Sequence, residues 1–431
     1  MPAVTPERRR ILAWCLFDWA NSPYTTLVVT FIYSAYFAQT FAPDVLTGTA
    51  WWSRAVAFAG LAVAVLAPLV GALADRGGLR VRLFALATAT CVVATGALTF
   101  VPPGGGPHGN AILALVLFAL ADIGFELGML FYNALLPAIA KPEQLGRVSG
   151  YGWALGYVGG LVALVIALVG FVKPEVPWFG ITRAAGFNYR ATCLLAAVWL
   201  AVFSVPLFLT LRGERSSVAR LDVRAAFAEL AATFRSVRRY RDAVLFLVSR
   251  LLFNDGLITV FAFGGIYAAG TFGMTLADVI TFGIAINVAA GLGAFGFGFV
   301  DDRIGSKRTV LLSCAALAAA TALAVWAPTR TWFWIAGMMI GLFAGPNQAA
   351  SRSLMARFAP PGNENEFFGF FAFSGRLTAF AGPLLLGLAT QWFGSQRAGV
   401  ATVLLFFLAG GGLLLRVDEK RGQATRALHP S

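Results

Sequence analysis

Residues 71–78, Gly71-Ala72-Leu73-Ala74-Asp75-Arg76-Gly77-Gly78, and residues 298–305, Gly298-Phe299-Val300-Asp301-Asp302-Arg303-Ile304-Gly305, follow one pattern. In both stretches a glycine is followed, after three residues, by Asp-Arg, and a second glycine closes the pattern. Each copy lies between two long apolar segments. Loops repeated in this way are typical of membrane proteins built from two related helical bundles, so the sequence predicts a duplicated membrane fold.

The composition of the chain agrees with this prediction. Of 431 residues, 58% are hydrophobic and 12% are charged, and the mean hydropathy is +0.76. A soluble domain is far less apolar and carries about twice the charge. Each apolar stretch is near the ~20 residues that a bilayer requires, and we therefore predict an all-α polytopic protein with twelve transmembrane helices in two pseudo-symmetric six-helix bundles. The predicted spans are 11–40, 50–73, 81–101, 110–139, 147–172, 188–211, 243–269, 274–300, 308–327, 331–356, 366–391 and 396–415.

The distribution of basic residues predicts how the chain is oriented. The formal net charge is +13, and the bases gather near residues 8–10, 76–82, 141–147, 307–308 and 416–426. Because basic loops stay in the cytoplasm, both termini are expected to be cytoplasmic. The charge therefore reports topology, and we expect no nucleic-acid partner, since no nucleic-acid-binding motif accompanies it.

The predicted domains are an N-terminal bundle (1–211), a cytoplasmic linker (212–242) and a C-terminal bundle with a short cytoplasmic tail (243–431). Arginines alternate with apolar residues in the linker, which favours an amphipathic helix on the anionic inner leaflet. A solvated tether whose charge only fixes topology is an equally open interpretation.

Polar residues inside the apolar spans mark the candidate substrate site. A charged side chain that faces lipid at mid-bilayer costs about 2.5–3.5 kcal/mol on insertion scales, so these residues should face protein or water. Four of these polar residues lie about ten to twelve residues, or roughly 15–18 Å, from the end where their span enters the membrane, and so near the midplane: Asn21, Asp122, Asp255 and Arg376. The candidate substrate-binding residues are Asp18, Asn21, Asn254, Asp255, Gln348 and Arg376.

Asp122 and Glu126 are the candidate proton-coupling residues. They lie four residues apart on one face of a predicted helix. Two carboxylates so close in a low dielectric do not both ionise readily, so one of them is a candidate proton carrier. The alternative, in which one carboxylate pairs permanently with Arg376 or another base and only locks the bundle, stays open.

The duplicated loops predict a conformational latch without substrate contact. Each aspartate follows the end of a span, where a neighbouring helix can present its N-terminal dipole, and the bases can meet carboxylates or lipid phosphates. The first glycine of each copy permits close helix approach, and the last permits a tight turn. The latch candidates are Gly71, Asp75, Arg76, Gly298, Asp302 and Arg303.

Several classes of chemistry lack their sequence patterns. The chain has no G-x-x-x-x-G-K-[ST] loop, which argues against direct drive by ATP. The two histidines and four cysteines form no cluster, so we expect neither a metal site nor a cofactor. No nucleophile stands beside a base, and we expect no enzyme activity.

Several motifs make the chain similar to a known family. The duplicated loop resembles that of the major facilitator superfamily. Further motifs resemble its autophagy-linked vacuole effluxer-like branch over nearly the whole chain. These motifs are Leu16-Phe17-Asp18-Trp19-Ala20-Asn21-Ser22, Phe131-Tyr132-Asn133-Ala134-Leu135-Leu136-Pro137, Asn254-Asp255-Gly256, Gln348-Ala349-Ala350-Ser351-Arg352-Ser353, Glu366-Phe367-Phe368-Gly369, Ser374-Gly375-Arg376 and Gly382-Pro383.

The resemblance implies a secondary transporter that works by alternating access and, by the fungal members, exports amino acids from the vacuole. Departures from the family pattern are Phe17 in place of Tyr, Arg376 in place of Lys, and Pro346-Asn347 in place of glycines. We expect the protein to transport a small polar solute, with an amino acid as the leading candidate. Transport is expected to be outward and coupled to protons. A sugar or drug carrier of the same fold is the alternative, and a non-transporting receptor or assembly factor is the rival from another class.

Two further expectations concern the setting in which the chain works. Its Arg-heavy basic residues indicate a GC-rich bacterial genome, which would make the membrane the plasma membrane. The expected partners are the solute, protons and the lipid bilayer, with the monomer as the functional unit.

Overall fold

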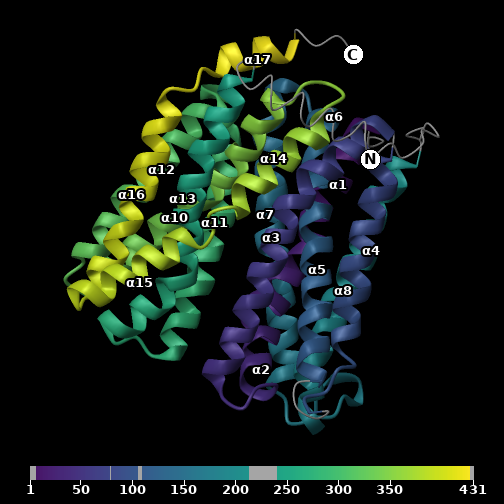
Figure 1. The fold of residues 1–431 in the computed structure, drawn as a ribbon, viewed down its shortest axis with the longest axis vertical. Helices are drawn as coiled ribbons and strands as arrows, with labels where there is room; N and C mark the ends of the chain where they lie inside the picture. Colours follow the sequence, from purple (N-terminus) through teal and green to yellow (C-terminus); the bar gives the residue numbers. More distant parts are fainter. Residues whose placement is uncertain (1–5, 78, 105–108, 213–239, 428–431) are drawn as a thin grey trace, which may run out of the picture. The chain divides into compact units, whose positions relative to one another are not determined.

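The computed structural model describes residues 6–77, 79–104, 109–212 and 240–427, and within these ranges it is helical with no strand (Figure 1). The first half contains α1 (Pro6–Pro23), the π-helix η1 (Tyr24–Phe31), α2 (Tyr33–Thr40), α3 (Val45–Gly77), α4 (Arg80–Leu98), α5 (Gly109–Ala134), α6 (Leu136–Ile139), α7 (Leu145–Ala167), the π-helix η3 (Leu168–Val172) and α8 (Phe187–Leu211). The second half contains α10 (Arg241–Phe272), α11 (Leu276–Ile304), α12 (Ser306–Trp326), α13 (Arg330–Phe358), α14 (Glu364–Arg376), α15 (Ala381–Phe393), α16 (Gln396–Leu415) and α17 (Glu419–Ala427). Short 3-10 turns lie at Pro142–Gln144, Trp178–Gly180 and Ala184–Gly186.

The helices have the length and composition of membrane spans. Within the described residues, 10 helical segments are long and apolar enough to cross a bilayer. The remaining two predicted spans are also helical: one is the α1–η1–α2 segment, and the other is α13, which carries the polar residues described below. Large apolar side chains such as Val93 and Leu292 are 69% and 66% exposed, as expected for surfaces that face lipid. The predicted linker falls almost wholly outside the described residues.

Contacts divide the chain into two compact units. One comprises residues 1–66, 77–132 and 155–221, and the other residues 67–76, 133–154 and 222–431. The second unit thus includes short pieces of α3, α5 and α7 from the first half. Consequently both copies of the duplicated loop motif bring their aspartates to this unit.

Pro23 interrupts the first predicted span. Proline has no N–H group, so the carbonyl four residues earlier, that of Trp19, loses its helical donor. Nε1 of Trp199 on α8 donates to this oxygen at 3.1 Å. The chain then continues as the π-helix η1. A neighbouring helix therefore satisfies the freed carbonyl, as a membrane interior requires.

The eleventh predicted span is also broken, between α14 and α15. α14 ends at Arg376 and α15 begins at Ala381, and Pro383 in the first turn of α15 cannot donate back to Ala379. Oδ2 of Asp255 on α10 accepts the backbone N–H of Gly382 at 3.0 Å. A buried carboxylate therefore lies at the start of α15, where unpaired N–H groups and the helix dipole favour negative charge.

The C-terminal helix α17 is attached to the second unit by charged groups. Glu419 accepts the backbone N–H groups of Ser306 at 3.3 Å and Lys307 at 3.1 Å, and so caps α12. Nε of Arg421 lies 2.6 Å from Oδ2 of Asp242 at the start of α10. These contacts join the tail to two helices of the second half.

Candidate functional site

The first copy of the duplicated motif lies against the start of α14. Asp75 accepts the backbone N–H groups of Asn365 at 3.2 Å and Glu366 at 2.8 Å, and Nδ2 of Asn365 donates at 2.6 Å. A Cβ atom on Gly71 would meet the backbone oxygen and carbon of Asn365 at less than van der Waals distance. The glycine thus allows the two backbones to approach, and the carboxylate lies on the N-terminal turn of α14.

The second copy repeats this arrangement at the start of α7. Asp302 accepts the backbone N–H of Gly146 at 2.9 Å and a hydrogen bond from Nε of Arg147 at 2.7 Å. A Cβ atom on Gly298 would lie 2.8 Å from Cα of Arg147. Both aspartates therefore accept N–H groups from the first turn of another helix, beside a glycine that the other backbone touches.

The remaining motif residues are placed less uniformly. Gly305 has φ +93°, a conformation that glycine adopts without strain, and directly precedes α12. Arg303 is exposed, whereas the side chain of Arg76 and the whole of Gly78 fall outside the described parts of the chain. The latch assignment stays a proposal, which these contacts support.

A small polar cavity, here called the Arg352 pocket, lies within the second unit. Its volume is about 40 Å³, whereas one water needs ~10–15 Å³ on a comparable measure. It therefore has room for a group of a few heavy atoms. It is lined by Asn133, Trp153, Arg250, Phe253, Asn254, Asn347, Gln348, Ser351, Arg352 and Phe371, a set with two guanidinium groups and no carboxylate.

Arg352 is the buried centre of this pocket. It is 2% exposed, and its Nε and Nη2 donate to Oγ and the backbone oxygen of Ser149 at 2.9 and 2.6 Å. Nη1 donates to Oδ1 of Asn133 at 3.3 Å, and the guanidinium carbon lies 5.7 Å from the ring centre of Trp153. These bonds hold the guanidinium in one orientation at the pocket wall.

Arg250 forms the second cationic wall. Its Nη1 donates to the backbone oxygen of Phe371 at 2.7 Å and to Oγ of Ser374 at 2.8 Å. The guanidinium carbon lies 3.6 Å above the ring of Phe371. A position near the cytoplasmic end of a span favours a long side chain that reaches the membrane surface. Arg352 does not reach it, since it is 2% exposed and its guanidinium contacts Ser149 and Asn133.

Two buried polar atoms of the pocket lack a partner. Oδ1 of Asn347 and Oγ of Ser351 form no hydrogen bond with any described residue, although these residues are only 0% and 2% exposed. An unsatisfied buried polar group costs about 1–3 kcal/mol. An acceptor and a hydroxyl left open beside two guanidiniums are consistent with a site that is completed by a polar ligand or water.

The structure separates the candidate substrate residues of the second half. Asn254 and Gln348 line the Arg352 pocket, and Nδ2 of Asn254 donates to the backbone oxygen of Gly375 at 3.2 Å. Asp255, one residue further along α10, is directed to Gly382 instead. Arg376 ends α14 and does not line the pocket. Sequence reasoning missed Arg352 as a site residue, although it lies one helical turn from Gln348, which was included.

In the first unit, Asp18 and Asn21 lie together on α1. Oδ2 of Asp18 accepts a hydrogen bond from the hydroxyl of Tyr132 at 2.7 Å. Nδ2 of Asn21 donates to the backbone oxygen of Phe17 at 2.9 Å and to Oδ1 of Asp18 at 3.4 Å. Both residues are 5% exposed. Asp18 is thus held inside this bundle by neutral donors.

The carboxylates of α5, Asp122 and Glu126, are four residues apart and lie on one face of that helix. Asp122 is 4% exposed, and the hydroxyl of Tyr24 on η1 donates to its Oδ1 at 3.5 Å. Glu126 is half-buried one turn later. Within the described residues no cluster of His, Cys, Asp and Glu is able to hold a metal ion.

Comparison with solved structures identifies the fold. The chain matches the major facilitator proton:xylose symporter XylE with a TM-score of 0.71 over 98% of both chains at 12% identity. It matches a bacterial homologue of the iron transporter ferroportin in an outward-facing state with a TM-score of 0.70, over 96% of this chain and 99% of that one, at 14% identity. The protein has the twelve-helix major facilitator fold.

Sequence comparison identifies the family. Residues 141–427 match the family described as "Vacuole effluxer Atg22 like", and the chain belongs to this family. It is 25% identical to the uncharacterized MFS-type transporter YxiO of Bacillus subtilis, over 95% of this chain and 94% of YxiO. The protein is accordingly a multi-pass membrane transporter, not an enzyme.

The chain also resembles fungal proteins of the same family. It is 24% identical to autophagy-related protein 22-1 of Neosartorya fischeri over 306 residues, which cover 64% of this chain and 49% of the fungal protein. The chain thus spans about half the length of this relative.

Proposed function

We propose that this transporter moves a small solute with a carboxylate group out of the cell by alternating access, and that an amino acid is the leading candidate for this solute. The observation that carries the proposal is the Arg352 pocket, whose walls hold two guanidiniums and no carboxylate. Such a lining favours an anionic group, and guanidiniums bind carboxylates through paired hydrogen bonds. The family description as a vacuole effluxer supports export of a solute from a membrane-bound compartment, and export from the cell is the direction that we propose.

The size of the pocket supports recognition of one functional group. A volume of about 40 Å³ has room for a carboxylate group but not for a whole solute. The open atoms of Asn347 and Ser351 provide an acceptor and a hydroxyl beside the cations. We propose that Arg352 and Arg250 meet the carboxylate, since Arg376, the arginine among the sequence candidates, does not line this pocket. Asp18 or Asp255 is the proposed partner of the substrate ammonium.

The remaining parts of the proposal concern energy and location. Asp122 and Glu126 are the proposed proton carriers, and the two Gly…Asp-Arg copies are the proposed latch. The bacterial relative supports the plasma membrane as the location, with both termini in the cytoplasm by the charge distribution. We propose that the monomer is the functional unit.

The test is counterflow exchange in proteoliposomes, with a panel of amino acids, their carboxamides, their decarboxylated amines, and sugars. The proposal expects exchange of at least one amino acid and at least tenfold weaker competition by its amide and amine. Arg352→Gln should weaken affinity at least tenfold, and Arg352→Lys less, since it keeps the charge. Arg308→Gln, an exposed arginine of the same unit, should leave affinity unchanged.

Other outcomes would decide for the alternatives. Exchange of a sugar or an uncharged drug that is indifferent to Arg352→Gln would replace the amino-acid proposal by a carrier of another solute. If the protein binds a solute but shows no flux, and is monodisperse after reconstitution, the result would favour a non-transporting receptor or assembly factor. Inward-only flux would contradict the export direction.

A further inference from the structure

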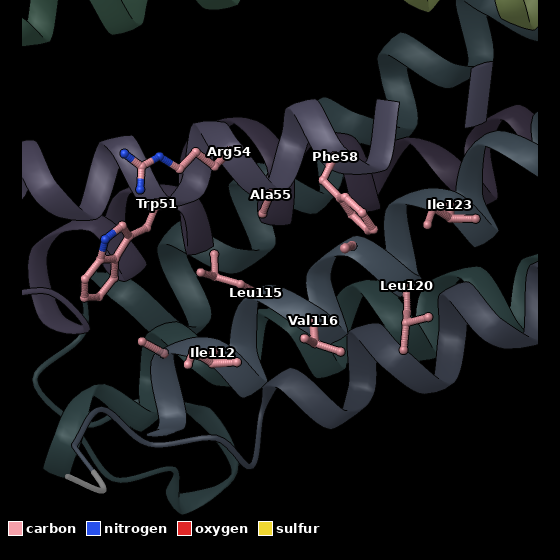
Figure 2. Close-up of a pocket in the computed structure, with 11 residues that line it drawn as sticks. Trp51, Arg54, Ala55, Phe58, Ile112, Leu115, Val116, Leu120 and Ile123 are labelled. Carbon is pink, nitrogen blue, oxygen red and sulfur yellow. The ribbon is translucent and has the colours of Figure 1, made fainter. Parts of the chain in front are cut away.

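The first unit has an apolar groove between α3 and α5 that the proposed function does not use. Its volume is about 550 Å³, and Figure 2 shows its side chains along the two helices. Ala55 and Ala119, 9% and 7% exposed, lie low in the groove, while Phe58 and Ile112 are 64% and 57% exposed. Small buried residues beside large exposed ones make a trough open to the surroundings, and within a bilayer those surroundings are lipid.

The groove has one polar end. Figure 2 shows Trp51 and Arg54 at one end and Leu120 and Ile123 at the other. Arg54 is the only charged residue among the groove's lining residues, and its exposed guanidinium has no hydrogen bond or ion pair with the described residues. A cation at the mouth of an apolar trough is complementary to a lipid, whose anionic phosphate would meet the cation while the acyl chain lies in the trough.

The position of Arg54 along α3 agrees with this pattern. Arg54 and Asp75 are 21 residues apart on one helix, or about 31 Å, which is the ~30 Å thickness of the hydrocarbon core. With Asp75 at one membrane boundary, Arg54 lies at the other. Trp51 next to it is of the type enriched at this level.

The length of the groove corresponds to one leaflet. On α5 its lining extends from Ala111 to Ile123, about 18 Å at 1.5 Å per residue, close to half of the ~30 Å core. The trough therefore ends near mid-bilayer, where an acyl chain from a headgroup at Arg54 also ends.

We propose that this groove is a binding site for one anionic phospholipid, with the phosphate on Arg54 and an acyl chain between α3 and α5. In the proposed topology the lipid belongs to the outer leaflet. A phosphate oxygen supplies an acceptor for Arg54, which has none among the described residues, and the net negative headgroup balances its charge. The apolar lining then accounts for chain burial, since burial of each CH₂ contributes about 0.8 kcal/mol.

Native mass spectrometry of the full chain in detergent, titrated with phosphatidylglycerol or phosphatidylethanolamine, tests this site. We expect one phosphatidylglycerol to bind at least tenfold more tightly than phosphatidylethanolamine. Arg54→Gln should remove this preference, and Arg54→Lys should keep part of it. Ala119→Leu, which fills the trough without changing the charge, should weaken the binding of phosphatidylglycerol at least fivefold.

Two variants outside the groove are the controls. Arg82→Gln removes an exposed cation at the other end of the bundle, and Ala89→Leu adds the same bulk to an exposed position of α4. Both should bind phosphatidylglycerol as the wild type does. Equal binding of both lipids by the wild type, or unchanged phosphatidylglycerol affinity in both Arg54→Gln and Ala119→Leu, would overturn the proposal. If Arg54→Gln is not monodisperse, Arg54→Lys and Ala119→Leu decide.

Discussion

Nε of Arg147 donates a 2.7 Å hydrogen bond to Asp302, and the backbone N–H of Gly146 donates to the same carboxylate. Asp75 is held in the same way by the first turn of α14, through Asn365 and Glu366. The first turn of a helix has unpaired N–H groups and a positive dipole end, so it favours an anion. Each copy of the motif therefore joins a helix of one half to a helix of the other through a carboxylate.

Asp75→Asn and Asp302→Asn are predicted to slow transport and to leave substrate affinity nearly intact. An amide keeps one acceptor oxygen but turns an NH₂ group toward donors, and it loses the charge that the helix end favours. Only the state with these contacts is weakened. The measurements are the counterflow rate and the equilibrium Kd for the same substrate.

Glu143→Gln is the matched control, because Glu143 is an exposed carboxylate in the short 3-10 turn that directly precedes α7. It should leave both quantities unchanged. The latch proposal fails if either aspartate variant loses as much affinity as Arg352→Gln does.

Gly71→Ala and Gly298→Ala are predicted to disturb the same contacts by steric means. The added methyl on Gly298 would lie 2.8 Å from Cα of Arg147, and the one on Gly71 would press on the backbone of Asn365. Real Cβ atoms do not approach backbone this closely, so the helices must separate. The counterflow rate should therefore fall at least several-fold in both variants.

The same helices provide controls for this prediction. Gly60 on α3 and Gly296 on α11 have open space at the Cβ position. Gly60→Ala and Gly296→Ala should therefore keep wild-type transport, and stability should be equal or slightly higher because alanine favours helix. Equal loss of transport in all four variants would show that glycine content, not close approach, matters.

The twelve-helix fold was predictable from the sequence because its signals are local. Apolar runs of about the bilayer thickness and repeated basic loops need no tertiary information. The two breaks were less apparent in the apolar pattern, although each has a proline, Pro23 and Pro383, that removes a backbone donor. How the freed groups are satisfied, by Trp199 for example, depends on a partner far away in the chain.

The Arg352 pocket was only partly predictable. Asn254 and Gln348 were expected from their motifs and do line it. Arg352 lies near a helix end, where long side chains usually reach water, so its position in the sequence does not predict burial. Its actual partner is Ser149, more than 200 residues earlier, and no local pattern encodes such a pairing.

Glu126→Gln is predicted to abolish flux driven by a pH gradient while substrate counterflow continues. Exchange requires alternating access without net proton movement, so it does not need a proton carrier. If Asp122 and Glu126 share a proton, changing either residue alters the coupling. Proteoliposome flux with and without a pH gradient, beside counterflow, measures both activities.

The alternative role for this pair predicts a different result. A carboxylate that only locks the bundle should, when neutralised, cost both activities or proper folding, because a buried partner is left unpaired. Tyr24→Phe is an informative companion, since it removes the 3.5 Å hydrogen bond to Asp122 without changing charge. Unchanged gradient-driven flux in both Asp122→Asn and Glu126→Gln would exclude α5 from coupling.

Asp255→Asn is predicted to preserve or raise thermal stability and to reduce transport at least tenfold. Asp255 is 1% exposed, its Oδ2 accepts the N–H of Gly382, and its Oδ1 has no hydrogen-bond partner among the described residues. A buried carboxylate with so little compensation is costly, and a neutral amide of the same shape is less so.

Asp242→Asn on the same helix is the matched comparison, because Asp242 is paired with Arg421 at 2.6 Å and the protein should lose stability when this carboxylate is neutralised. Apparent Tm in detergent and the counterflow rate give the two readouts for both variants. If the carboxylate of Asp255 serves transport, Asp255→Asn has an equal or higher Tm and loses transport. A lower Tm with normal transport would show that Asp255 only caps α15.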